Sequence, residues 1–258
     1  MTTTSTTPSH HHHVDSQFGD QACAYLTSQV HAAGRDLERL QHFLAAFPGA
    51  SVLDIGCGAG HASYVAAAQA GCVIAYDLSA QMLDVVAATA RERGLDNLTT
   101  RQGVAESLPF EDSSMDVVIS RYSAHHWHDV GMALREIRRV LRPGGQCVMM
   151  DIMSPGHPAS DIWLQTIEAL RDTSHVRDYS AGEWAGFFSH AGLAVNQMHC
   201  ERQTLDFTSW VQRMRTPEAL VAAIRLYQDS APEEVKRYFD LQPDGTFTSD
   251  TLWMSGTR

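Results

Sequence analysis

The sequence predicts an α/β fold built on a doubly wound, mostly parallel sheet. Three features lead to this prediction. A short apolar strand runs into a glycine-rich turn and then into an alanine-rich helix at residues 51–70. Strand-like and helix-like stretches then alternate as far as about residue 151, which is typical of parallel strands joined by helices. Beyond that point the pattern is mainly helical, so we expect a helical cap over the carboxyl ends of the strands.

The N-terminal segment precedes the first strand. Residues 1–14 are rich in Thr and Ser and contain four consecutive histidines, so we expect a disordered tail. A metal site is disfavoured there because nothing nearby completes a set of ligands. Residues 17–47 have helical spacing, and Gly34 is expected to divide them, with the second helix over about 35–46.

The chain from residue 15 to residue 258 is expected to form a single domain, with its core at about 35–152. Each predicted strand is a short apolar run, and each helix repeats apolar side chains every three or four residues. The parallel part takes further strands at 71–76, 98–102, 115–120 and 146–151 and helices at 80–93 and 130–141. Cap helices are expected within about 155–191 and 208–240, with strands inside 193–207 and at 246–255.

Composition limits the partners that we expect. The net charge is −11 and Lys and Arg do not cluster, so the chain lacks the positive surface that binds nucleic acid. No apolar run approaches the roughly 18 residues that span a bilayer, so membrane insertion is not expected. The five cysteines never form a C-x-x-C pair, which is typical of reduced thiols. We therefore expect a cytoplasmic protein, as a monomer or homodimer, that acts on a small molecule.

The glycine-rich turn, SVLDIGCGAGH over residues 51–61, indicates a nucleotide-like ligand. Glycine lets the backbone turn sharply and approach a ligand where a Cβ would clash. The third glycine comes one residue earlier than in the dinucleotide pattern G-x-G-x-x-G. Asp54 directly precedes the turn, where its charge opposes a pyrophosphate and favours an ammonium group. The turn therefore indicates S-adenosylmethionine (SAM), which has an amino-acid end and no phosphate, rather than NAD.

Side chains that follow the next strands are candidate ligand-binding groups, because ligands bind at the carboxyl ends of parallel strands. Asp77 stands 17 residues after Gly60 and is expected to accept hydrogen bonds from both ribose hydroxyls. After the third strand, the backbone of residues 103–110 is expected to contact adenine, with Leu78 and Leu108 as apolar walls. The alternative for Leu108 is a place in the core.

The segment after the fourth strand, RYSAHHWHD over residues 121–129, carries the most reactive side chains. Arg121 lies nearest the strand end and is expected to line the cofactor site. His125 and His126 are candidate bases or hydrogen-bond donors to the substrate, because a neutral imidazole can take a proton near pH 7. A zinc site from His125, His128 and Asp129 is disfavoured because no second cluster completes it, and we expect no metal. His128 and Asp129 are instead expected to cap the following helix.

Four motifs together resemble one family. Residues 52–60 (VLDIGCGAG), 77–79 (DLS), 105–110 (AESLPF) and 140–145 (VLRPGG) are similar to those of class I SAM-dependent methyltransferases. The nearest resemblance is to the ubiquinone/menaquinone-biosynthesis C-methyltransferase-like group. This resemblance implies a Rossmann-like sheet of seven strands in the order 3-2-1-4-5-7-6, with the seventh antiparallel. It also implies SAM as the cofactor and S-adenosylhomocysteine (SAH) as its product.

The resemblance also implies which residues bind the cofactor. The turn would hold the methionine part of SAM, Asp77 its ribose, and Leu78 one face of adenine. Ala105 and Glu106 follow the position that contacts adenine, where many relatives have Asp and this chain has Val104. Because the Val104 side chain cannot accept a hydrogen bond, a backbone carbonyl, Glu106 or water is expected to accept the hydrogen bond from adenine in its place. The full set of expected cofactor residues is Asp54, Gly56, Cys57, Gly58, Asp77, Leu78, Ala105, Glu106 and Arg121.

The predicted function is methyl transfer to a small apolar or aromatic acceptor. Such a transfer is an in-line displacement that mainly requires the reacting atoms to be held about 3 Å apart without water. Tyr25 and His31 are expected to contact the substrate, and His126 is the expected base. Trp163, Trp184 and Trp210 are expected either to line the substrate's path or to anchor the cap. The alternatives are a SAM-binding sensor or partner protein without activity, and an NAD(P)-dependent oxidoreductase.

Overall fold

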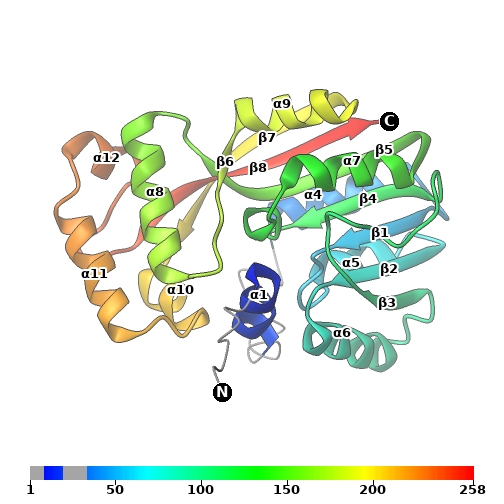
Figure 1. The fold of residues 1–258 in the computed structure, drawn as a ribbon, viewed down its shortest axis with the longest axis horizontal. Helices are drawn as coiled ribbons and strands as arrows, with labels where there is room; N and C mark the ends of the chain where they lie inside the picture. Colours follow the sequence, from blue (N-terminus) through cyan, green and yellow to red (C-terminus); the bar gives the residue numbers. More distant parts are fainter. Residues whose placement is uncertain (1–8, 20–33) are drawn as a thin grey trace, which may run out of the picture.

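A single sheet forms the centre of the computed structural model, which describes residues 9–19 and 34–258. The strands lie in the order β3-β2-β1-β4-β5-β8-β7 (Figure 1). The first five of these pair in parallel, whereas β8 is antiparallel to both β5 and β7. Their bounds are β1 Ser51–Ile55, β2 Cys72–Asp77, β3 Leu98–Gln102, β4 Met115–Arg121, β5 Leu141–Ser154, β7 Ala194–Leu205 and β8 Phe247–Thr257.

This order is the predicted one, but the sheet has eight strands rather than seven. The additional strand, β6 (Tyr179–Ser180), pairs in parallel with Met153 and Ser154 at the end of β5. Two residues are too few to show the alternating pattern by which a strand is recognised in a sequence. The antiparallel last strand is confirmed as β8.

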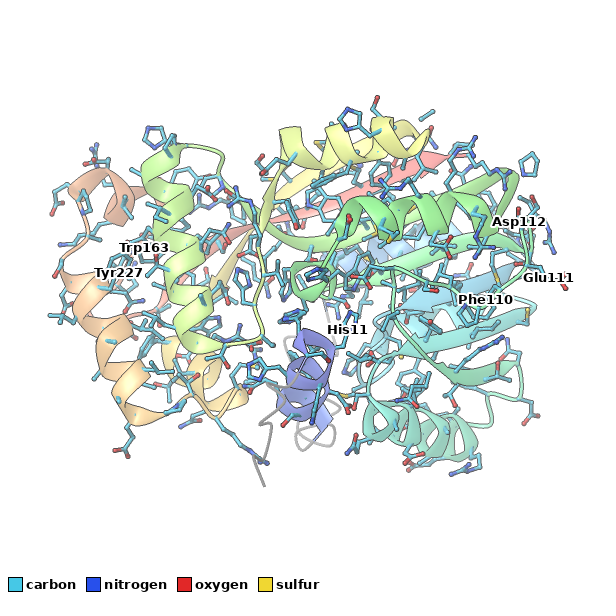
Figure 2. All side chains as sticks on the ribbon, in the orientation of Figure 1. His11, Phe110, Glu111, Asp112, Trp163 and Tyr227 are labelled. Carbon is cyan, nitrogen blue, oxygen red and sulfur yellow. The ribbon has the colours of Figure 1, made fainter. Side chains whose placement is uncertain are left out.

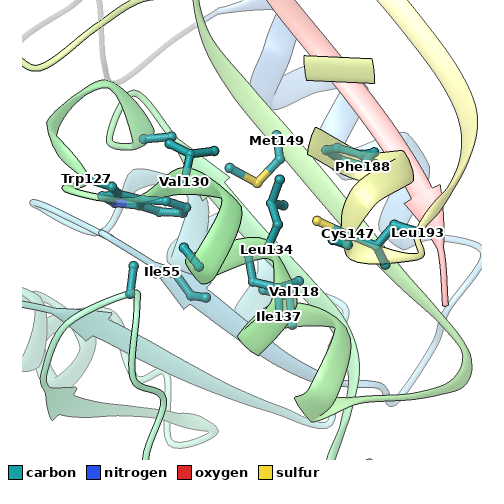
Figure 3. Close-up of a cluster of buried hydrophobic side chains, with 14 of the residues drawn as sticks. Ile55, Val118, Trp127, Val130, Leu134, Ile137, Cys147, Met149, Phe188 and Leu193 are labelled. Carbon is teal, nitrogen blue, oxygen red and sulfur yellow. The ribbon is translucent and has the colours of Figure 1, made fainter. Parts of the chain in front are cut away.

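Helices cover both faces of the sheet. On one face α4 (Arg35–Leu44) and α5 (His61–Ala67) bury their apolar sides, and α6 (Ala80–Arg93) packs beside β2 and β3. On the other face lie α7 (Val130–Val140) and α9 (Ala181–Ala191), whose side chains share one core with β1, β4 and β5 (Figure 3). The sheet is therefore covered on both faces, as a doubly wound fold requires.

The cap is a separate helical group beyond the carboxyl ends of the parallel strands (Figure 1). It comprises α8 (Pro158–Arg171), α10 (Phe207–Arg213), α11 (Glu218–Asp229) and α12 (Glu233–Tyr238), which share their own core. Trp163 on α8 stacks on Phe239 with ring centroids 4.3 Å apart, and Tyr227 on α11 packs against the same core (Figure 2). Trp163 thus anchors the cap.

Helix α9 corrects the expectation that residues 155–191 all belong to the cap. Its Trp184 and Phe188 are fully buried in the main core, against α7 and the sheet. The apolar spacing predicted this helix correctly, but spacing alone does not say which hydrophobic surface the helix will cover.

Helix α1 (His10–Gly19) shows that the expectation of a disordered tail was wrong for residues 10–14. It lies between the cap and the sheet, and His11 on it is labelled in Figure 2. Side chains of this helix contact the rest of the chain, which holds it in place: His10 Nε2 is 2.9 Å from the carbonyl oxygen of His126, and His13 Nε2 is 2.8 Å from Thr173 Oγ1.

Tyr25 and His31 lie outside the described residues, so their expected contacts with substrate remain predictions. No helix in the described ranges is long and apolar enough to cross a membrane.

Candidate active site

A cavity lies at the carboxyl ends of β1, β2 and β4, with a volume of about 1060 Å³ including its mouth. The residues around it come from the glycine turn, the segments after β2, β3 and β4, and helix α1. All nine expected cofactor residues line it, namely Asp54, Gly56, Cys57, Gly58, Asp77, Leu78, Ala105, Glu106 and Arg121. The structure therefore brings these predicted residues together in one place.

The glycine turn presents bare backbone to this cavity. Gly56 has a φ of +64°, and a Cβ on it would lie 1.8 Å from Ser123 Oγ. Its amide and that of Cys57 donate to the Tyr76 carbonyl at 2.7 and 3.1 Å, which ties the turn to β2. Gly58 has a φ of +50°, and a Cβ on it would meet no atom within 4 Å. Glycine is therefore required at Gly56 by contact and at Gly58 by backbone conformation.

Asp54 is a fully buried carboxyl group at the edge of the cavity. Ser63 Oγ donates to its Oδ2 at 2.6 Å, whereas Oδ1 has no hydrogen-bond partner among the described residues. Burial raises the pKa of Asp54 to about 7, against the hydrogen bond from Ser63. A buried carboxyl group with an unsatisfied oxygen suits the amino group of a ligand, which would supply both a hydrogen bond and a positive charge.

Asp77 fixes the turn and also faces the cavity. Gly58 N donates to its Oδ2 at 2.8 Å and Ser79 N donates to its Oδ1 at 2.9 Å. Burial raises the pKa of Asp77, and these backbone donors oppose that shift. Each carboxylate oxygen accepts more than one hydrogen bond, so both can also receive a ribose hydroxyl.

The adenine side differs in part from expectation. Leu78 and Ala105 line the cavity, but Leu108 is buried in the main core and does not line it, so the expected Leu108 wall was wrong. The Val104 carbonyl accepts from Tyr76 Oη at 3.1 Å. Glu106 Oε1 accepts from the amides of His128 and Asp129 at 2.8 and 3.2 Å, so Glu106 organises that turn as well as lining the cavity.

Arg121 ends β4 with its side chain largely buried at the cavity wall. Its Nε donates to Asp36 Oδ2 on α4, and its guanidinium lies 4.7 Å from the ring centroid of Tyr122.

Asp129 has the predicted capping role, because its Oδ1 accepts from Met132 N at 2.8 Å at the start of α7. No group of three or more His, Cys, Asp or Glu side chains in the described ranges could hold a metal ion.

His125 is paired with an acid. Its Nδ1 lies 2.5 Å from Asp151 Oδ1, and its backbone amide donates to Asp151 Oδ2 at 3.3 Å. Burial alone would lower the pKa of His125, but the charge and hydrogen bond of Asp151 outweigh burial and raise the pKa to about 9. The ring is therefore protonated near pH 7. It can donate a hydrogen bond but cannot serve as a base, which narrows the two predicted roles to one.

His126 has the opposite character. Burial lowers its pKa to about 3, and the positive charge on His125, whose ring centroid is 4.2 Å away, adds to that shift. Its Nδ1 is 3.2 Å from the carbonyl oxygen of Ser174. Because a carbonyl only accepts, Nδ1 carries the hydrogen and Nε2 keeps a lone pair. His126 is thus a neutral imidazole with an acceptor nitrogen.

A second cavity of about 590 Å³ adjoins the first, and Phe18, Tyr122 and His126 line both. Sequence reasoning missed most of its residues. Its remaining lining is His125, Ile152, Glu168, Arg171, Asp172, Asp178, Gln203, Leu205, Trp210, Arg213 and Met214. Of the three tryptophans considered for the substrate's path, only Trp210 lines it.

Tyr122 is one of the residues that sequence reasoning missed, and it has an unusual backbone conformation. Its φ is +50°, which is strained for a side chain of this size. Its hydroxyl donates to Gln203 Oε1 at 3.0 Å, and Tyr122 lines both cavities. A sequence carries no signal of this kind, because the strain appears only in the folded backbone.

The residues of the first cavity fit SAM on three observations: bare glycine backbone, an unsatisfied buried oxygen on Asp54, and a two-oxygen acceptor at Asp77. Comparison with known proteins agrees with this fit. Residues 53–149 match the family model described as a methyltransferase domain. The chain belongs to the SAM-dependent methyltransferases, and its cofactor is SAM. The NAD(P)-dependent alternative is therefore set aside.

Two relatives extend across most of the chain. The uncharacterised protein YafE of Escherichia coli K12 is 61% identical over 203 residues, which are 79% of this chain and 98% of YafE. The uncharacterised methyltransferase YcgJ of Bacillus subtilis 168 is 34% identical over 225 residues, covering 87% of this chain and 89% of YcgJ. The crystal structure of YcgJ superposes with a TM-score of 0.83 at 33% identity, covering 87% of this chain and 98% of that one.

Cofactor affinity is expected to rise with pH because of Asp54. Its pKa of about 7 means that the free protein holds this proton below neutrality, whereas a ligand ammonium group binds the ionised carboxylate. Affinity for SAH should therefore rise up to about tenfold per pH unit below pH 7 and then level off. Calorimetry at pH 5.5, 6.5 and 7.5, in buffers of different ionisation enthalpy, measures both the affinity and the proton release.

The variant Asp54→Asn is the control for this pH dependence, since an amide has the same shape and does not titrate. It should bind SAH more weakly, with an affinity that no longer changes over this range. An unchanged slope in Asp54→Asn would assign the proton to another group.

Proposed function

We propose that this methyltransferase transfers a methyl group to a small molecule held in the second cavity. The observation that carries this proposal is the junction of the two cavities at Phe18, Tyr122 and His126. A methyl donor in the first cavity and an acceptor in the second would meet there, next to the acceptor nitrogen of His126. Bound SAM supplies an activated methyl group on a sulfonium.

The protein's own contribution is to orient the acceptor and to exclude water. Phe18, Leu205, Trp210 and Met214 give the second cavity apolar walls. Apart from Ile152, the rest of its lining consists of charged, amide, imidazole and phenol side chains, so we propose an acceptor with an apolar body and a polar reacting end. This proposal is more specific than the apolar or aromatic acceptor expected from the sequence, because it adds a polar reacting end. His126 Nε2 would accept a hydrogen bond from the reacting group and take its proton where the transfer releases one.

The test is SAH formation by the purified protein with SAM and a small-molecule extract of cells. We expect SAH above the level of an enzyme-free control, together with a methylated product in the extract. Binding of SAM without SAH formation would instead support the alternative of a sensor or partner protein.

The role of His126 is tested by two substitutions of opposite design. In His126→Asn the amide can still donate to the Ser174 carbonyl, but the acceptor at the position of Nε2 is lost. In His126→Gln the longer side chain can place an amide oxygen near that position. We expect turnover to fall about 100-fold in the Asn variant and less in the Gln variant, with SAM affinity unchanged in both. Equal turnover in wild type and His126→Asn would remove His126 from the mechanism.

A further inference from the structure

Two hydrogen-bond acceptors face each other at the edge of the second cavity. One is His126 Nε2, whose lone pair is left bare because Nδ1 carries the ring's hydrogen toward the Ser174 carbonyl. The other is Asp172 Oδ2, at 3.8 Å from Nε2. This separation is too long for a hydrogen bond, and neither atom has a hydrogen to offer.

Asp172 is held so that only this oxygen remains open. The amide and hydroxyl of Ser174 both donate to its Oδ1, at 2.8 and 2.6 Å. No hydrogen bond to Oδ2 is present in the part of the chain that the structure describes, although the side chain is almost fully buried. Burial alone would raise the pKa of Asp172, but the two Ser174 donors and the nearby charge of Arg171 oppose burial and the pKa lies below its ordinary value, so the group is a carboxylate.

A buried pair of bare acceptors is unfavourable unless a third group supplies a hydrogen to each. An atom about 2.9 Å from both can do so if it carries two hydrogens. A hydroxyl carries one hydrogen, and a tertiary amine or carbon nucleophile carries none to give. A water molecule can donate one hydrogen to each acceptor. Among nucleophiles, a primary amine can replace that water and still keep a lone pair for reaction.

Two other charged side chains of this cavity are already paired with acids. Arg171 is matched by Glu168 at 2.9 Å, and protonated His125 by Asp151 at 2.5 Å. Asp178 is buried, and burial raises its pKa well above the ordinary value. Asp172 thus combines a lowered pKa with the absence of any cation within hydrogen-bond distance among the described residues.

We propose that the acceptor is a small molecule with a primary amine, whose two N–H groups are held by His126 Nε2 and Asp172 Oδ2. This inference rests on the proposed function and specifies the chemical class of its substrate. The two hydrogen bonds leave the nitrogen lone pair free to face the first cavity. The apolar walls formed by Leu205, Trp210 and Met214 would receive the carbon skeleton.

The proposed step balances as follows in atoms and charge. The amine arrives as an ammonium ion, with an ordinary pKa of about 10, and loses one proton to water to give the neutral nitrogen. The nitrogen lone pair forms the new N–C bond while the S–C bond breaks and its electrons stay on sulfur. The products are the N-methylammonium ion and neutral SAH, and the proton released equals the one lost on binding.

The position of the transferred methyl group tests this inference directly. Wild-type protein is incubated with SAM carrying a CD3 group and a cell extract divided by ultrafiltration into small molecules and proteins. Mass spectrometry then locates the label. We expect CD3 on the nitrogen of a small amine. Label on oxygen or carbon would overturn the amine inference but leave the proposed function standing. Label only on protein, or none at all, would overturn both.

The variant Asp172→Asn tests the geometry. Its Oδ1 can still accept from Ser174, while a donor NH2 replaces the open Oδ2. We expect kcat/KM for the labelled amine to fall about 10- to 100-fold, mainly through KM, with SAM affinity unchanged. Asp161→Asn on α8 is the matched control, because Asp161 bonds Ser154 and Gln165 and lines neither cavity. Equal losses in the two variants, or none in Asp172→Asn, would overturn the role of Asp172.

Discussion

The variant Gly56→Ala is expected to lose both stability and cofactor binding. The new Cβ would lie 1.8 Å from Ser123 Oγ and 2.5 Å from Ser123 Cβ, so the segment after β4 would have to move. The left-handed backbone at Gly56 costs a further 1–2 kcal/mol, roughly, for a residue with a side chain. Overpacking adds about 1–3 kcal/mol, which makes a loss of about 2–5 kcal/mol in the free energy of unfolding.

Urea denaturation measures this loss, and Gly49→Ala is its matched control. Gly49 has a φ of +74°, a Cβ on it would meet nothing within 4 Å, and it lies outside both cavities. The control should lose only the free energy of unfolding that comes from the left-handed backbone, about 1–2 kcal/mol, and should still bind SAM. If both variants lost the same stability and bound SAM equally, the contact between the turn and Ser123 would not matter.

The variant Asp77→Asn is expected to weaken SAM binding about 100-fold or more. Two ribose hydroxyls would each lose a charged acceptor, worth about 1.5–3 kcal/mol apiece. One of the backbone donors, Gly58 N or Ser79 N, would also face an amide NH2 in place of an oxygen, which loosens the glycine turn.

Calorimetry with SAH measures this effect, and Asp116→Asn provides the control. Asp116 also accepts a backbone amide, that of Ser51 at 2.8 Å, but lines neither cavity. Its substitution should leave SAH affinity unchanged. Wild-type affinity in Asp77→Asn would contradict the placement of the ribose.

The fold and the cofactor cavity follow closely from the sequence because their determinants are local. The glycine turn and the segment at 103–110 each follow a strand directly, and Asp77 is the last residue of β2. A parallel sheet brings the carboxyl ends of its strands to one edge. Spacing of this kind is visible without a structure. Even here Leu108 was misplaced, since an apolar side chain in a loop can face a ligand or the core.

The second cavity could not be predicted in the same way. Asp172, Gln203 and Trp210 come from the end of α8, β7 and α10, and only packing of the cap brings them beside His126. The states of the two neighbouring histidines are equally nonlocal. The charge of Asp151, which lies 26 residues away in the chain, keeps His125 protonated, and the positive charge on His125 then helps to keep His126 neutral.

A crystal structure of the protein with SAH tests the central claim most directly. We expect both ribose hydroxyls within hydrogen-bond distance of the Asp77 carboxylate, and the amino group beside the open oxygen of Asp54. The sulfur should face the junction formed by Phe18, Tyr122 and His126. SAH bound elsewhere, or with its sulfur turned away from the second cavity, would contradict this account.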